Sequence, residues 1–228
     1  MGIYIYMKIH IVYFVYLKPN EWESIVLEQL SDLKSSKLYE IADTINISIC
    51  SDDISLKRLK QHIWAKFKKI QIINRVDNNQ YEYPGIKAVW DLSKKEDEDG
   101  VILYFHSKGM TSQVKTKGID ILRKFLFNNT ISNYEIYLNE FINNPQLDVG
   151  CIFPSEFGFS WYNFFWVKSS YVKNYLPEPI PNKNRYVWER YIGSEYSKKD
   201  VNCFSPFLGH NKLKNKAQLY QLKKRIMI

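Results

Sequence analysis

Residues 101–110 of this 228-residue chain read Val-Ile-Leu-Tyr-Phe-His-Ser-Lys-Gly-Met. The first five residues are apolar without a break, which is typical of a strand that is buried on both faces of a sheet. The run then changes abruptly to four residues, His-Ser-Lys-Gly, that are not apolar. Because ligands of open α/β sheets bind beyond the carboxyl ends of the strands, this break predicts a ligand site.

The four residues after the break suit a bound anion. Lys108 can neutralise negative charge, and Gly109 lets a ligand approach the backbone closely. His106 and Ser107 add an imidazole and a hydroxyl. An ordinary loop is the alternative interpretation, because a strand followed by a polar turn with glycine is common. We expect a binding role because other segments of the sequence support it.

The composition indicates one globular domain. Hydrophobic residues make up 45% of the chain and charged residues 25%, and 228 residues are enough to bury a core without metal or disulfides. Cys50, Cys151 and Cys203 are odd in number and far apart, which argues against a disulfide framework and a structural zinc site. We expect buried free thiols in a reducing compartment.

The chain is basic, with a formal net charge of +8. Its lysines are spread along the sequence and no nucleic-acid-binding motif is present, so we expect no nucleic-acid partner. The densest basic cluster, in residues 211–228, is expected to be a solvated tail that could associate weakly with an anionic membrane surface. Lys8 and His10 interrupt the apolar start of the chain, so we expect a cytoplasmic protein without a signal peptide or a membrane span.

Hydrophobic patterning predicts alternating strands and helices in the first half of the chain. Strands are expected at 8–17, 45–50, 70–76, 101–105 and 149–153, and helices at 21–33, 56–67, 84–95, 118–128, 131–143 and 185–191. Residues 174–184 hold three prolines and are expected to be a loop. This order is typical of a mostly parallel sheet with helices on both faces.

Four segments together resemble the motifs of a known family. They are Glu82-Tyr83-Pro84 at a helix start, Leu103 to Gly109 at a strand end, Asn163-Phe164-Phe165-Trp166, and Arg185 to Gly193 with Glu189 inside it. In this order they are similar to glycosyltransferase-like proteins of bacteria, algae and large DNA viruses. That family has Ser-Gly where this chain has Trp161-Tyr162. The likeness spans residues 82–193.

The resemblance implies a single-domain, GT-A-like (Rossmann-like) α/β fold. It also implies a glycosyltransferase that moves a sugar from a nucleotide-diphosphate sugar to a glycan or protein acceptor, in the viral members as part of glycan synthesis. The nucleotide-binding half would be residues 7–115, the acceptor-side half 116–210 and the basic tail 211–228. The rival interpretations are a non-catalytic glycan-binding or scaffold protein on a degenerate transferase fold, and a nucleic-acid-binding protein.

The candidate site residues follow from the strand ends and from the resemblance. We expect donor binding by Asp52, Glu82, His106, Ser107, Lys108 and Gly109, acceptor binding by Asn163 and Trp166, and Glu189 as the catalytic base, with Asp148 and Glu156 behind it. Several of these residues have an alternative interpretation, in which they serve the fold and bind no ligand. Asp52 could cap a helix and Glu82 could start one, the aromatic run 161–166 could be core, and Glu189 could pair with Arg185 on the surface.

The site also raises the question of a metal cofactor. Many GT-A enzymes carry Asp-x-Asp at the corresponding strand end, where this chain has His106-Ser107-Lys108. Either Lys108 supplies the positive charge directly, or His106 joins a carboxylate such as Asp52 or Asp77 to hold manganese or magnesium. The first is favoured, because hard cations prefer oxygen ligands.

Overall fold

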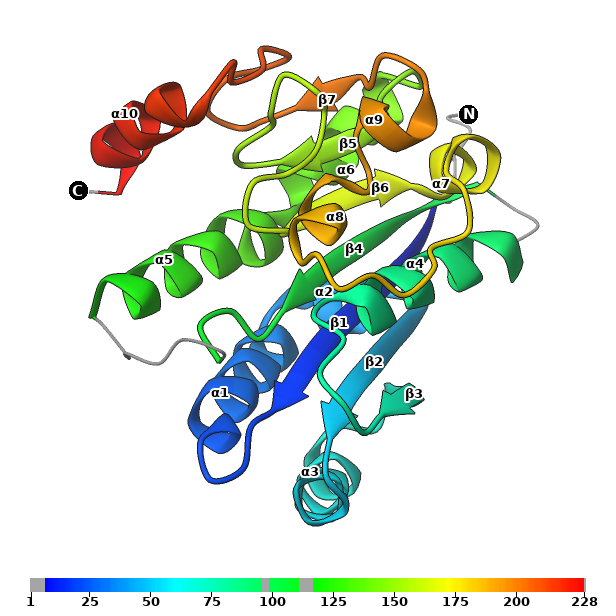
Figure 1. The fold of residues 1–228 in the computed structure, drawn as a ribbon, viewed down its shortest axis with the longest axis vertical. Helices are drawn as coiled ribbons and strands as arrows, with labels where there is room; N and C mark the ends of the chain where they lie inside the picture. The colour runs from blue at the N-terminus through cyan, green and yellow to red at the C-terminus, as the bar shows by residue number, and fades with distance from the viewer. Residues whose placement is uncertain (1–6, 96–98, 111–116, 228) are drawn as a thin grey trace.

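The fold is one seven-stranded sheet with helices on both faces (Figure 1). The computed structural model describes residues 7–95, 99–110 and 117–227. The sheet order is β3-β2-β1-β4-β6-β5-β7, and only β6 runs antiparallel to its neighbours in the described sheet. The strands are β1 (Lys8–Leu17), β2 (Thr44–Ser51), β3 (Ile70–Val76), β4 (Gly100–His106), β5 (Val149–Cys151), β6 (Phe165–Lys168) and β7 (Cys203–Phe204).

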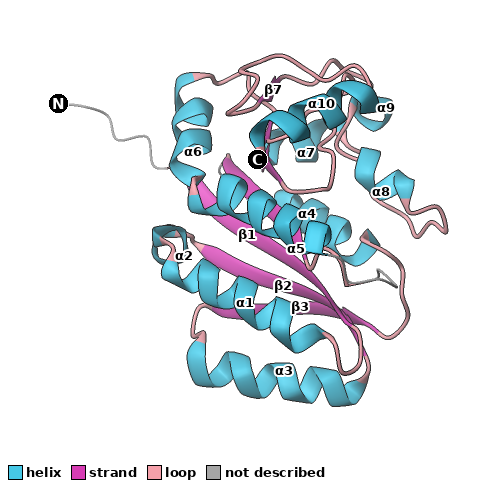
Figure 2. Ribbon diagram, turned by 90° about the vertical axis from the view of Figure 1, so that its left-hand side faces the viewer, coloured by secondary structure: helices cyan, strands magenta, loops and turns pink. Residues whose placement is uncertain are grey.

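The helices pack on the two faces in separate layers (Figure 2). They are α1 (Trp22–Ser35), α2 (Lys37–Ile41), α3 (Asp53–Lys66), α4 (Tyr83–Lys95), α5 (Lys117–Phe127), α6 (Tyr134–Asn143), α7 (Ser169–Tyr175), α8 (Tyr186–Arg190), α9 (Ser194–Ser197) and α10 (Lys216–Ile226), with a π-helical turn at Asn128–Ser132. In the described part of the chain, no helix has the length and apolarity to cross a membrane.

Alternation along the buried strands creates two hydrophobic cores. In β4, Leu103 packs into the core under α1, α5 and α6, whereas Ile102 and Tyr104 pack into the core under α4, α7 and α8. Both faces of β4 are therefore covered, as its continuous apolar run predicts. The expected α/β class, a mostly parallel sheet with helices on both faces, is confirmed. The GT-A-like assignment stays a prediction.

The expected strands and helices of the first half are present, with ends shifted by a few residues. The three cysteines are buried and free, as predicted. The prediction of a long loop at 174–184 missed that α7 ends at Tyr175, and the expected tail 211–228 contains α10. The proposed boundary at 115 lies outside the described residues.

The sheet and α4 together fix the position of the candidate site. At Gly85, an added Cβ would lie 2.6 Å from Cβ of Phe14 and 2.8 Å from Cε2 of Tyr104. Only glycine allows α4 to pack this close to β1 and β4. The backbone N–H of Ser107 donates to the carbonyl of Phe14 at 3.0 Å. The start of α4 and the end of β4 are thus held beside each other at the carboxyl edge of the sheet.

Candidate active site

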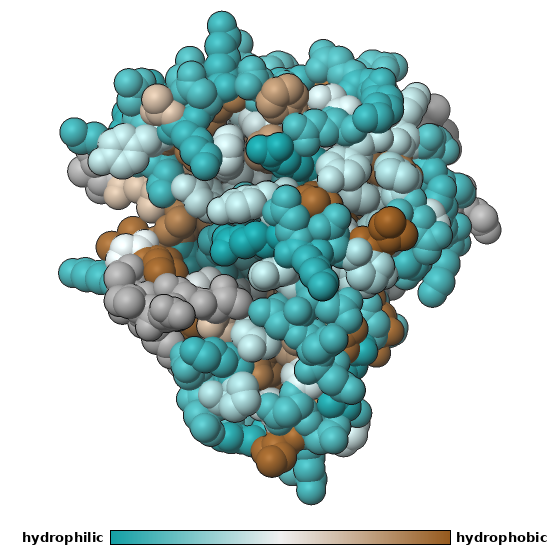
Figure 3. All heavy atoms as spheres, in the orientation of Figure 1, coloured by the Kyte–Doolittle hydropathy of each residue, from teal (hydrophilic) through white to brown (hydrophobic). Residues whose placement is uncertain are grey.

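A cavity of about 280 Å³ lies beyond the carboxyl ends of β1 and β4. Its wall includes six of the nine predicted site residues, namely Glu82, His106, Ser107, Lys108, Gly109 and Glu189. It also includes Arg185, which begins the motif at 185–193 but is not one of the nine predicted site residues. The face of the molecule seen in Figure 3 is mostly hydrophilic and is hollowed near its centre. The strand break thus opens into a cavity, and ligand binding there stays a prediction.

His106 is a buried imidazole in the wall of this cavity. Its Nε2 lies 3.0 Å from the carbonyl oxygen of Tyr162 and 3.8 Å from Oε1 of Glu82. Burial lowers the pKa of His106, which the Glu82 carboxylate opposes in part. Because a carbonyl only accepts hydrogen bonds, Nε2 carries a proton in this contact and donates it to the Tyr162 carbonyl.

Ser107 and Gly109 shape the backbone of the loop that follows β4. The Ser107 hydroxyl oxygen accepts a hydrogen bond from the backbone N–H of Tyr16 at 3.1 Å, which links the loop to β1. Gly109 has a φ of 91°, and a Cβ there would lie 2.6 Å from Cγ2 of Ile119. Both the left-handed backbone and the lack of space require glycine. Ser107 therefore ties residues 107–110 to β1, and position 109 requires glycine.

Lys108 is the cation that the sequence predicts at this place. Its Nζ lies 5.1 Å from the ring centroid of Tyr162, and no carboxylate lies within ion-pairing distance among the described residues. Burial lowers the pKa of Lys108, while the more distant carboxylates of Glu82 and Glu189 act in the opposite direction. An anion in the cavity would supply the close partner that this ammonium group lacks.

Asn163 supports Glu82 and does not contact the cavity. Its side-chain amide donates to the Glu82 carboxylate and, at 3.2 Å, to the carbonyl of Trp188 in α8. Asn163 is fully buried. The prediction that Asn163 binds the acceptor is therefore corrected, because a side chain without exposed surface cannot touch a substrate in this conformation. It positions Glu82 and joins the start of α4 to α8.

Trp166 and Asp52 have structural roles, in agreement with the alternative interpretations given for them above. Trp166 is fully buried, and its Nε1–H donates to the carbonyl of Thr130 at 2.9 Å. It is a core residue rather than an acceptor-binding one. The carboxylate of Asp52 accepts from the backbone N–H of Ser55 at 2.7 Å and caps α3. Asp52 is not part of the cavity wall, so its predicted donor contact is corrected as well.

Glu189 lies in the same cavity as His106 and Lys108, as predicted. Its side chain keeps 19% of its surface exposed and lies 3.9 Å from the Arg185 guanidinium. Burial raises the pKa of Glu189, and the negative charge of Glu82 raises it further. A half-buried carboxylate with a raised pKa, facing a cavity, has the properties of a general base.

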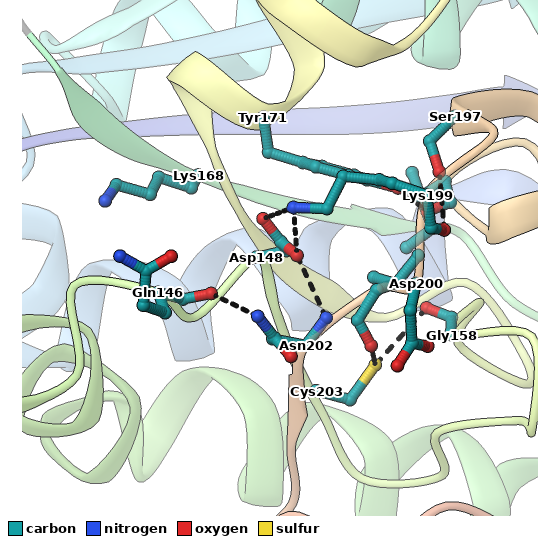
Figure 4. Close-up of polar contacts among 12 residues, drawn as sticks. Gln146, Asp148, Gly158, Lys168, Tyr171, Ser197, Lys199, Asp200, Asn202 and Cys203 are labelled. Atoms are coloured by element: carbon teal, nitrogen blue, oxygen red, sulfur yellow. Dashed lines mark hydrogen bonds and ion pairs between the residues drawn. The ribbon is translucent and has the colours of Figure 1, made fainter.

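The two alternative bases lie elsewhere. Asp148 precedes β5 at the opposite edge of the sheet, where it accepts from Lys199 Nζ at 2.9 Å and from the backbone N–H of Asn202 at 2.9 Å (Figure 4). Glu156 is exposed and belongs to a different surface hollow, beside Arg190. Neither is part of the cavity wall. Glu189 is therefore the predicted base that the geometry favours.

The residues present do not fit a divalent cation. Among the described residues, no three His, Cys, Asp or Glu side chains form a group that could hold a metal ion. Of the predicted partners of His106, Asp52 caps α3 and Asp77 pairs with Arg75 at 2.8 Å. The cavity carboxylates face Lys108 and Arg185 instead.

A second hollow of about 350 Å³ adjoins the cavity and shares Lys108, Arg185 and Glu189 with it. Its far wall is formed by α10, which contributes Lys216 and Lys223. The interpretation of residues 211–228 as only a solvated tail is thus incomplete. We refer to this space as the α10 hollow.

No protein-family model and no curated protein matches the chain. Solved structures cover most of it at low similarity. They include S. aureus TarS 1-349 (TM-score 0.49, 13% identity, covering 96% of this chain and 64% of that one) and a cytidylyltransferase from Leptospira borgpetersenii (TM-score 0.41, 13% identity, covering 96% and 95%). The chain thus spans less than two thirds of the TarS structure. Likeness at this level does not define a reaction or a substrate, and the family suggested by the motifs stays a prediction.

Proposed function

We propose that the chain is a glycosyltransferase that moves a sugar from a nucleoside-diphosphate sugar to an acceptor hydroxyl. One observation carries the proposal: Lys108, which lacks a close carboxylate partner among the described residues, and Glu189, whose pKa is raised, face one cavity at the carboxyl edge of a mostly parallel sheet. A cation for a leaving group and a base for an incoming hydroxyl are the two groups that such a transfer needs.

The proposed donor site is the cavity floor. Lys108 and Arg185 are its cations, and both would bind the diphosphate of the donor. Negative charge grows on this diphosphate as its bond to the sugar breaks, and fixed cations stabilise that charge without any further rearrangement. Ser107 and Gly109 belong to the wall of the same cavity, so the phosphates would bind beside this loop.

The proposed base is Glu189. The acceptor oxygen forms a bond to the anomeric carbon while the bond from that carbon to the diphosphate oxygen breaks, and the hydroxyl proton passes to the Glu189 carboxylate. The nucleoside diphosphate leaves with the bonding electron pair, paired with Lys108 and Arg185. This order of events corresponds to transfer with inversion of configuration.

The test is a screen of nucleotide sugars by thermal shift, followed by measurement of nucleoside-diphosphate release. A ligand that binds only the folded state raises the melting temperature. We expect one uridine- or guanosine-diphosphate sugar to do so. Glu189→Gln should keep this binding while turnover falls by roughly 100- to 10,000-fold, and the control Glu156→Gln should leave turnover unchanged.

Other results would indicate a different function or a different base. Binding of a nucleotide sugar without any turnover, including turnover with added acceptors, would indicate a non-catalytic binding protein. Release of pyrophosphate from a nucleoside triphosphate would indicate nucleotidyl transfer. Equal turnover of wild type and Glu189→Gln would remove Glu189 as the base.

A further inference from the structure

One face of α10 is built to line the α10 hollow. Lys216, Leu219, Tyr220 and Lys223 are spaced by three, four and seven residues, so they share one face of the helix. All four belong to the wall of the hollow, opposite Trp161 and Tyr162. Leu219 is buried, which anchors the helix, while the two ammonium groups flank it along the wall. The helix thus presents two cations at a fixed separation.

The hollow carries an excess of positive charge. Among the described residues in its wall are the four cations Lys108, Arg185, Lys216 and Lys223 and the single carboxylate Glu189. No carboxylate lies within ion-pairing distance of Lys216 or Lys223 in the described part of the chain. The positive charges of Arg185 and Lys223 contribute to lowering the pKa of Lys108, after burial. An anion in the hollow would relieve this repulsion.

Tyr162 contacts two of these cations, Lys108 and Lys223. Its ring centroid is 5.1 Å from Lys108 Nζ and 5.0 Å from Lys223 Nζ, and Lys223 also donates a hydrogen bond to its hydroxyl at 3.0 Å. Tyr162 has a φ of 73°, which is unfavourable for a bulky side chain. Such strain is retained mainly where the surroundings or the function require it. Here it directs an aromatic ring into a cationic hollow.

We propose that the α10 hollow binds the acceptor, and that the acceptor is an anionic saccharide. A phosphate or carboxylate on the saccharide pairs with Lys216 and Lys223, and the rings of Trp161 and Tyr162 provide the apolar surface for its sugar. Glu189 is common to the α10 hollow and the cavity, so it faces both the acceptor hydroxyl and the donor. This inference rests on the proposed transferase function.

The experiment measures saccharide binding without any donor. Glucose-6-phosphate, glucuronate and methyl glucoside are titrated against the full chain by NMR, at two salt concentrations. We expect one or both anionic sugars to bind and the neutral one to bind at least about tenfold more weakly, with an affinity for the anionic sugars that falls as salt rises. Whether the phosphate or the carboxylate is preferred distinguishes the two sources of the charge.

Matched double variants locate the binding. Lys216→Ala with Lys223→Ala should weaken binding of the anionic sugar by about 10- to 100-fold. Lys224→Ala with Arg225→Ala removes the same charge from the same helix but from outside the hollow, and should weaken it less than about threefold. Circular dichroism of both variants checks that α10 and the rest of the chain stay folded.

The outcomes separate this inference from the proposed function. If uridine diphosphate binds the wild type but no anionic sugar does, the acceptor assignment fails while the transferase proposal stands. If the Lys216 and Lys223 variant loses uridine diphosphate instead of the sugar, the hollow belongs to the donor. Binding of an acidic peptide and of no saccharide would also overturn the assignment. An equal loss of saccharide affinity in both double variants would also overturn the assignment, because it would show a diffuse effect of charge and not a site in the hollow.

Discussion

Asn163 determines where Glu82 lies. Its amide holds the Glu82 carboxylate and the carbonyl of Trp188 at once, and its φ of 51° is left-handed. Asparagine tolerates this backbone better than most residues with a side chain, and it also supplies the donors. One residue thus fixes the position of a cavity carboxylate relative to α8. The sequence left two roles open for Asn163, since the aromatic run 161–166 suited either a ligand site or the core.

Replacing Asn163 with alanine should lower the free energy of unfolding by about 2 to 4 kcal/mol. The change removes a hydrogen bond to a charged group and places alanine in a left-handed conformation. Denaturant unfolding measures the loss. Asn163→Gly loses the same hydrogen bonds but accepts the backbone, so it should be at least as stable as Asn163→Ala. An alanine variant clearly more stable than the glycine variant would contradict the left-handed geometry.

The pKa of Glu189 should lie above 4.5, the ordinary value for glutamate, and it can be followed by NMR titration without any substrate. Glu82→Gln removes a negative neighbour and should move the Glu189 pKa down, although burial keeps it raised. Lys108→Ala removes a positive neighbour and should move it up. If turnover requires deprotonated Glu189, the turnover of the wild type should rise with pH through the Glu189 pKa measured by NMR.

Shifts of the same sign in both variants, or no shift in either, would mean that these charges do not face Glu189. Glu156→Gln serves as the control, since Glu156 lies in another hollow and should leave the Glu189 pKa in place.

At the scale of elements, Asp148 joins the start of β5 to the segment that leads into β7. It accepts from the backbone N–H of Asn202 and from Lys199 (Figure 4). The Nζ of Lys199 also lies 4.6 Å from the centroid of the Tyr175 ring. β5 and β7 are short, and they form only two paired positions. This buried carboxylate therefore contributes to holding the edge of the sheet together.

Asp148→Ala should lower the free energy of unfolding by about 2 to 4 kcal/mol, because it leaves a backbone N–H and a lysine without their partner. Asp200→Ala is the control. Asp200 pairs with Lys212 at 2.7 Å but is 86% exposed, so its loss should cost about 1 kcal/mol or less. Thermal or denaturant unfolding compares the two. Equal losses would mean that the Asp148 pair acts only as a surface pair.

The elements differ in how well the sequence predicts them. β4 is predicted well because five apolar residues followed by a polar break leave few alternatives. α10 was missed because its lysines dominate the composition of residues 211–228, although the spacing of Lys216, Leu219, Tyr220 and Lys223 carries a helical period. That spacing was the available signal for the α10 hollow. The number of lysines alone did not indicate α10, because it carries no information about their spacing.

At the scale of the whole molecule, the parallel strands predict where a site lies, but not which side chains reach it. Glu82, His106 and Glu189 come from three distant segments, and the sheet and α8 bring them to one cavity. Trp166 and Asn163 come from the same aromatic run but are turned into the core. Alternation along β6 decides the orientation of Trp166, and the register of β6 depends on pairing across the sheet, whereas Asn163 lies before β6 with a left-handed backbone. Sequence alone did not fix that register.

The central claim is that the cavity at the end of β4 binds a nucleotide sugar through Lys108. Isothermal titration of uridine- and guanosine-diphosphate sugars into the wild type, Lys108→Ala and Lys224→Ala tests it directly. We predict that one donor binds the wild type, that Lys108→Ala weakens it by about 10- to 100-fold, and that Lys224→Ala changes it by less than about threefold. The claim is contradicted if neither class of donor binds, or if Lys108→Ala binds as tightly as the wild type.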